Sequence, residues 1–184
     1  MSRIVAFYSM VVVLSACPAF AVTDQATGLA IEPPAPFTAT LVDRLPANTA
    51  AMINVTLPGS TAGGFVGDND ECAITFRLLP QNAPYTQQQI NATAVSPEMK
   101  NLTKASLQLG FDVGDAVEFD IAGAAGLEFV GKMKAGPRAG VPTYIATVQT
   151  PKGATLLMCF SSSARFEGLV PQFRAVRDAI KPPR

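Results

Sequence analysis

The sequence predicts an α+β fold: a largely antiparallel sheet with helices packed on its faces. Three observations indicate this class. Strand-like segments follow one another through short turns, a polar helical excursion interrupts them midway, and an amphipathic helix closes the chain. At 184 residues, with 48% hydrophobic and 15% charged residues, the chain can bury a sizeable core and lacks the composition of a disordered protein. No repeat of 20 to 50 residues is present, which excludes solenoids and propellers.

The first half of the fold is predicted to consist of short strands separated by breakers. Apolar or β-branched runs predict strands over residues 28–32, 38–42, 52–57 and 72–79. The run at 72–79 is the strongest, because Cys72, Ile74, Phe76 and Leu78 alternate with a second set of side chains. Residues 59–64 are rich in glycine and are predicted to form a turn or loop.

Two short helices are predicted in the middle of the chain. Thr86 is placed to cap a helix that begins at Gln87, and Ser96 precedes Pro97 in the pattern typical of a second helix start. Alternation then predicts strands over residues 117–121 and 127–134, each with one face in water, and residues 123–126 would connect them. The second of these strands would place Glu128 on its wet face.

A hairpin and a helix are predicted to end the chain. Strands over residues 144–149 and 154–160 flank a type I turn at residues 150–153. An apolar stripe then recurs at helical spacing, which indicates one buried helix face; it consists of Phe166, Leu169, Phe173, Val176 and Ile180. Because proline disrupts a helix interior, the regular helix is expected to begin near Val170, with Pro171 in its first turn.

The first 21 residues resemble an export signal. A basic start, an apolar run over residues 4–14 and small residues at positions 19 and 21 predict cleavage after Ala21. A second interpretation stays open, because residues 14–17 match the lipobox pattern in which Cys17 would be lipidated. The apolar run is too short for a transmembrane helix. The sequence thus predicts a signal peptide over 1–21, a flexible 22–27 and a single domain over 28–184, in a periplasmic, secreted or lipid-anchored protein.

Two cysteines remain after removal of the signal, Cys72 and Cys159. An even number of cysteines in an oxidising compartment predicts one disulfide. A catalytic dithiol is disfavoured, since such cysteines usually lie two residues apart. The two strands that carry Cys72 and Cys159 must therefore be neighbours or face each other.

The composition excludes several chemistries and leaves two candidate clusters. The chain has no histidine and a formal net charge of zero, which argues against histidine-activated nucleophiles and nucleic-acid binding. Residues 68–71 are acidic and could hold Ca²⁺, although a solvated turn fits the spacing better. One of the serines at residues 161–163 could be a nucleophile with Lys152 as its base, but Ser163 is better explained as a helix cap. No cofactor and no metal site are predicted.

The order of elements resembles the PsbP-like superfamily. The similarity rests on residues 28–34, the 72–79 strand, the glutamine-rich helical segment, residues 157–162 and the helix over 173–180. It implies an α-β-α sandwich that binds or assists other proteins, and it carries over no site residues. The expected function is that of a non-enzymatic accessory or binding module for an unidentified protein or complex of the bacterial envelope. A small-ligand-binding protein with an apolar pocket under the helices, and a histidine-independent hydrolase, are the alternatives.

Overall fold

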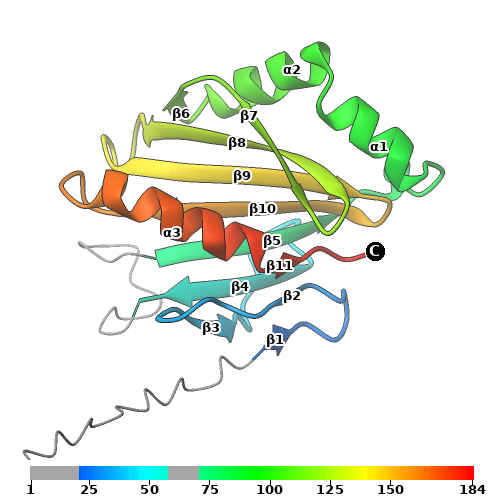
Figure 1. Ribbon diagram of the computed structural model, residues 1–184, viewed down its shortest axis with the longest axis horizontal. Helices are drawn as coiled ribbons and strands as arrows, with labels where there is room; N and C mark the ends of the chain where they lie inside the picture. The colour runs from blue at the N-terminus through cyan, green and yellow to red at the C-terminus, as the bar shows by residue number, and fades with distance from the viewer. Residues whose placement is uncertain (1–20, 58–70) are drawn as a thin grey trace, which may run out of the picture.

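The computed structural model describes residues 21–57 and 71–184 and is built around a large antiparallel sheet (Figure 1). In this part of the chain, eight strands form that sheet in the order β3-β4-β5-β10-β9-β8-β6, and β7 pairs with β8. The strands are β3 (Thr38–Leu41), β4 (Ala51–Thr56), β5 (Glu71–Leu78), β6 (Phe111–Val113), β7 (Val117–Ile121), β8 (Ala124–Met133), β9 (Pro142–Thr150) and β10 (Gly153–Phe160). A small second sheet joins β1 (Val22–Thr23), β2 (Ala30–Ile31) and β11 (Ile180–Lys181).

Helices lie on both faces of the large sheet, which confirms the predicted α+β class. They are α1 (Gln87–Ala94), α2 (Pro97–Leu107) and α3 (Phe166–Asp178), with a short 3-10 helix, η1 (Pro80–Asn82), before α1. Figure 1 shows α3 lying across the middle of the sheet, and α1 and α2 near the end formed by β6 and β8. The predicted caps are present, since Thr86 and Ser96 accept hydrogen bonds from the backbone of α1 and α2.

The face under α3 carries the larger core. Cross-strand partners share a face of an antiparallel sheet, so Cys72, Cys159 and Tyr144 lie on the same side. The apolar stripe of α3 packs on this side, and Phe166, Phe173 and Val176 are almost completely buried. The opposite face has a smaller core under α1 and α2, made by Val113, Leu127, Phe129 and Ile145.

The start of α3 differs from the prediction. The helix begins at Phe166 rather than near Val170, and Pro171 lies inside it. Burial of the Phe166 and Leu169 side chains offsets the backbone hydrogen bond that Pro171 cannot donate. Ser163 does not cap the helix, whose N-cap is Arg165; the backbone carbonyl of Ser162 accepts from the N–H groups of Arg165 and Phe166 instead.

The connection between β7 and β8 is shorter than predicted. The turn consists of Ala122 and Gly123, which have positive φ angles of 53° and 78°, as in tight hairpins of the type I′ class. Gly126 belongs to β8, where a Cβ atom would lie only 2.4 Å from Cζ of Phe119. Glycine at this position therefore lets the Phe119 ring lie directly over the strand.

Short strands at the edges of the two sheets were not predicted from the sequence. Residues 22–27, predicted to be flexible, form β1 and a turn in which the Asp24 side chain accepts from the backbone N–H of Thr27 (2.8 Å). The three-residue β6 and the two-residue β11 carry no alternation of their own to reveal them. The candidate segments at residues 1–20, 59–64 and 68–70 lie outside the described residues.

Candidate functional site

A cluster of charged side chains lies beneath α3, on a strand face that the sequence predicted to be exposed to solvent. Glu128 in β8 is only 2% exposed. The strand alternates as expected, but the face assigned to solvent is covered by α3, so the predicted wet position is wrong. A carboxylate in such a place must be paired and hydrogen-bonded, because desolvation of a charge is costly.

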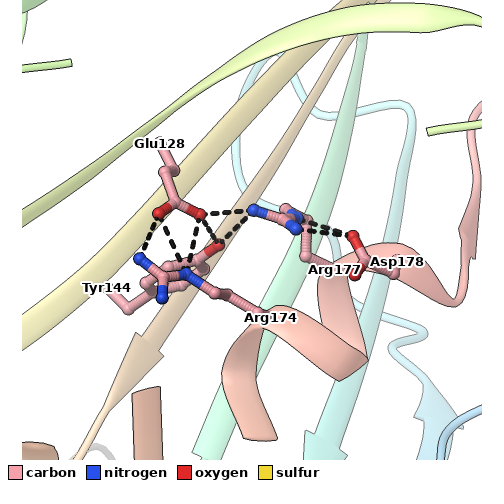
Figure 2. Close-up of polar contacts among 5 residues, drawn as sticks. All are labelled: Glu128, Tyr144, Arg174, Arg177 and Asp178. Atoms are coloured by element: carbon pink, nitrogen blue, oxygen red, sulfur yellow. Dashed lines mark hydrogen bonds and ion pairs between the residues drawn. The ribbon is translucent and has the colours of Figure 1, made fainter. Parts of the chain in front are cut away.

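Glu128 is fully engaged by three side chains, shown in Figure 2. Tyr144 Oη in β9 donates to Glu128 Oε2 at 2.7 Å. Arg174 Nη2 and Nε in α3 donate to Oε1 at 2.6 and 3.0 Å, and Arg177 Nη1 donates to Oε2. We call these four residues the α3 clamp, because they tie α3 to β8 and β9.

The surroundings of the clamp fix its protonation states. Burial favours a raised pKa for Glu128, but hydrogen bonds from Arg174 and Tyr144, together with the two arginine charges, outweigh it, and the pKa lies below its ordinary value. Burial and the hydrogen bond to Glu128 raise the pKa of Tyr144 strongly. Glu128 is thus ionised and Tyr144 neutral at neutral pH, which is the pairing that the observed hydrogen bonds require.

Arg177 extends the clamp to a third strand, β7, and to the end of α3. Its guanidinium lies 4.4 Å from the centre of the Phe119 ring in β7, a cation–π geometry. Its Nε also donates to Asp178 at 2.8 Å (Figure 2). Both carboxylate oxygens of Glu128 are paired within the protein, so the clamp holds α3 in place. The sequence signal was the pair Arg174 and Arg177, three residues apart and beside the buried stripe of α3.

The disulfide joins the two strands that the sequence singled out. Cys72 in β5 and Cys159 in β10 are direct cross-strand partners and form a disulfide with Cα atoms 4.0 Å apart. That separation is slightly below the usual range of about 4.4–6.8 Å. The bond lies in the core beneath α3 and ties β5 to the last hairpin, as expected.

The structure separates the predicted nucleophile from its predicted base. Lys152 lies in the turn before β10, whereas Ser162 and Ser163 follow the end of that strand. The eight residues of β10 hold them about 25 Å apart at the usual rise of a strand. Ser163 lines an open hollow with Asp112, Lys132 and Glu167, but it hydrogen-bonds none of them among the described residues.

The other acidic candidates form no metal site in the described part of the chain. Glu71 is nearly buried and pairs with Arg138, whose guanidinium lies 4.4 Å from the centre of the Phe160 ring. Over residues 21–57 and 71–184, no three acidic or cysteine side chains converge in a way that could hold a metal ion. In the same residues no helix is long and apolar enough to cross a membrane.

An open hollow of about 290 Å³ lies between α1, α2 and the end of β9. We call it the α1 groove. Its apolar wall consists of Ile90, Ala94 and Met99, with Tyr85. Ile90 and Ala94 are nearly buried, whereas Tyr85 is 54% exposed. This is the kind of pocket under the helices that the ligand-binding alternative requires.

The polar wall of the α1 groove has no charged residue. It consists of Asn82, Gln89, Thr93 and Gln149. Oε1 of Gln89 accepts from the backbone N–H and the hydroxyl of Thr86 at 2.9 and 3.1 Å. Oε1 of Gln149 accepts from Asn82 Nδ2 at 3.3 Å. The two glutamine amide nitrogens donate to no other described residue, so both remain available as donors.

The strand order, with α3 on one face and α1 and α2 on the other, defines a PsbP-like fold. Cyanobacterial PsbP (CyanoP) from Synechocystis matches with a TM-score of 0.54 and 11% identity, over 91% of this chain and 95% of that one. A Pseudomonas aeruginosa protein of unknown function, PA94, matches with a TM-score of 0.48 and 10% identity, over 79% of this chain and 98% of that one. No family model and no curated protein matches the chain. At these identities the likeness concerns the fold alone.

Proposed function

We propose that this protein is an exported, non-enzymatic accessory module that binds another protein of the bacterial cell envelope. The observation that carries the proposal is that the charged side chains of the clamp are paired within the protein, whereas the polar side chains of the α1 groove are accessible. The buried carboxylate of Glu128 and the arginines that pair with it are used to hold the fold together. The accessible α1 groove presents uncharged side chains suited to recognition. The PsbP-like fold favours the same class of role, because the resemblance implies a module that binds or assists other proteins.

Export is supported by two features that agree with the signal sequence. The disulfide between Cys72 and Cys159 is of the kind that persists in oxidising compartments. The first described strand, β1, begins at Val22, so cleavage after Ala21 would leave every described strand intact. Lipidation at Cys17 would keep a stretch of four residues, 18–21, between the anchored cysteine and β1.

The experiment for export is an intact-mass measurement on protein purified from its native cells. The proposal predicts a chain beginning at Val22, or one beginning at a Cys17 that carries three acyl chains, with no free thiol on Cys72 or Cys159. A full-length chain that retains Met1 and has both thiols free would contradict export.

The experiment for binding is a pull-down with the tagged mature chain from a native envelope extract. The proposal predicts one protein or complex enriched over an unrelated exported protein that carries the same tag. Recovery of the mature chain alone, from extracts that are crosslinked before lysis, would contradict it.

A small-ligand-binding role is the second candidate, favoured by the volume of the α1 groove. At about 290 Å³ it lies just below the lower limit of the usual range for ligand sites, roughly 300–1,000 Å³. Mass spectrometry of the protein purified under native conditions separates the two roles, because a retained small molecule of constant mass would favour ligand binding.

A further inference from the structure

We propose that the α1 groove is the recognition site of this module, and that it takes an uncharged, extended peptide segment of the partner with one apolar anchor side chain. The inference rests on the proposed binding function and specifies its site and its ligand chemistry. Three properties of the groove carry it: its size, its neutrality and its two unused donors.

The size of the groove suits one side chain. Interfaces gain most of their energy where an aliphatic or aromatic anchor enters a small desolvated pocket with a rim around it. The floor formed by Ile90, Ala94 and Met99 offers such a pocket, and methionine adapts to anchors of different shape. The exposed Tyr85 ring at the rim is of the residue type enriched at interfaces.

The neutrality of the groove selects against charged ligands. No lysine, arginine, aspartate or glutamate lines it, so a charged anchor placed against the buried Ile90 and Ala94 would gain no partner of opposite charge. A free carboxylate or phosphate would also find no cation there. The partner segment must therefore be uncharged where it enters the groove.

The two free donors can pair with the acceptors of a peptide backbone. The oxygens of Gln89 and Gln149 are held by Thr86 and Asn82, which fixes the orientation of both amides. Their nitrogens are left to donate to a ligand. An extended peptide presents carbonyl oxygens on both sides of an anchor residue at regular intervals. Such carbonyls would satisfy both amides, whereas a purely hydrocarbon ligand would leave them unpaired.

The test is a nuclear magnetic resonance titration of the ¹⁵N-labelled mature protein, which reports the side-chain amides of Gln89 and Gln149 directly. The probes are acetylated and amidated pentapeptides in which a central leucine, phenylalanine, aspartate or lysine is flanked by glycines. We expect the leucine or phenylalanine peptide to shift both amide signals, and to bind about tenfold or more tightly than the charged peptides. Equal binding of all four, or shifts confined to α3, would overturn the inference.

Matched variants control for the site. Thr93→Arg places a charge in the groove and should weaken binding about tenfold or more, whereas Gln88→Arg, on the exposed side of the same helix, should leave it unchanged. If Thr93→Arg does not fold, Gln149→Leu, which removes one donor and keeps the size, should also weaken binding. Binding of maltose at the same signals, with no binding of any peptide, would overturn the peptide assignment.

The pull-down distinguishes failure of this inference from failure of the proposed function. A partner captured equally by the wild-type protein and by a folded Thr93→Arg variant would leave the accessory function intact and refute the groove as its site. Peptide binding without any envelope partner would refute the accessory function alone.

Discussion

The two faces of the large sheet differ in how tightly they are packed and cross-linked. The face under α3 is sealed by apolar packing, crossed by a disulfide and held by the α3 clamp. The face under α1 and α2 has a smaller core, and no residue of α2 is fully buried. Its open groove keeps two amide donors unpaired. The contrast indicates that stability is concentrated on one side of the sheet, and the proposed function assigns recognition of a partner to the other side.

The largest stability effect is expected from loss of the disulfide. The bond closes a loop between residues 87 positions apart, and the chain-entropy model assigns such a loop about 4–5 kcal/mol. The double variant Cys72→Ala/Cys159→Ala should therefore unfold at much lower urea concentration than the wild type. A free energy of unfolding within about 1 kcal/mol of the wild-type value would show that the bond adds little to this face.

Truncation of the central aromatic of α3 should have a similarly large effect. Phe173 is completely buried, with its ring centre 6.1 Å from that of Tyr144 and 6.0 Å from that of Phe166. Phe173→Ala should lower the free energy of unfolding by about 3–5 kcal/mol, as measured by urea denaturation. A loss below about 1 kcal/mol would mean that α3 does not carry the main core.

Neutralising the clamp should have an intermediate, pH-dependent effect. Glu128→Gln keeps the size of the side chain but removes the charge that pairs with two arginines, and should cost about 2 kcal/mol at pH 7. Because the pKa of Glu128 is lowered in the folded protein, this contribution is present above the ordinary pKa of glutamate, about 4.3. It is lost as the pH falls through the lower folded pKa. Urea unfolding from pH 7 to pH 2 should show the two proteins converging in acid, and a constant difference would contradict the clamp.

The smallest effect is expected on the opposite face. Leu102 in α2 is 59% exposed, so Leu102→Ala should change the free energy of unfolding by less than about 0.5 kcal/mol. The comparison with Phe173→Ala sharpens the contrast between the faces, since both variants remove a large apolar side chain from a helix. A loss of more than about 2 kcal/mol for Leu102→Ala would show that α2 is as deeply packed as α3.

The sequence revealed the elements that have a strong period or a strong cap. Alternation located β5, β7 and β8, and the turn at residues 150–153 located the hairpin of β9 and β10. The apolar stripe of α3 was predicted with its correct buried face, although its last member, Ile180, lies in β11. The cysteine pairing followed from number and compartment. The start of α3 was predicted too late in the chain because of Pro171. Local helix propensity does not include the stabilisation that comes from burying Phe166 and Leu169 at that end.

The candidate site was harder to foresee, because it depends on contacts between distant segments. The alternation along its strand places Glu128 on the face that was expected to be exposed. The residue is buried because α3 packs over β8. The α1 groove is formed by residues of η1, α1, α2 and β9. No local pattern of glutamines and threonines in the sequence predicts that these segments form a groove.

The most direct test of the division between the two faces is site-specific photocrosslinking in native cells. A photoreactive phenylalanine derivative would replace Tyr85, at the rim of the α1 groove, or Gln172, on the exposed side of α3. The account predicts a discrete crosslinked adduct from position 85 and none from position 172. An adduct formed only from position 172, or equally from both, would contradict the assignment of recognition to the groove face and of stability to the α3 face.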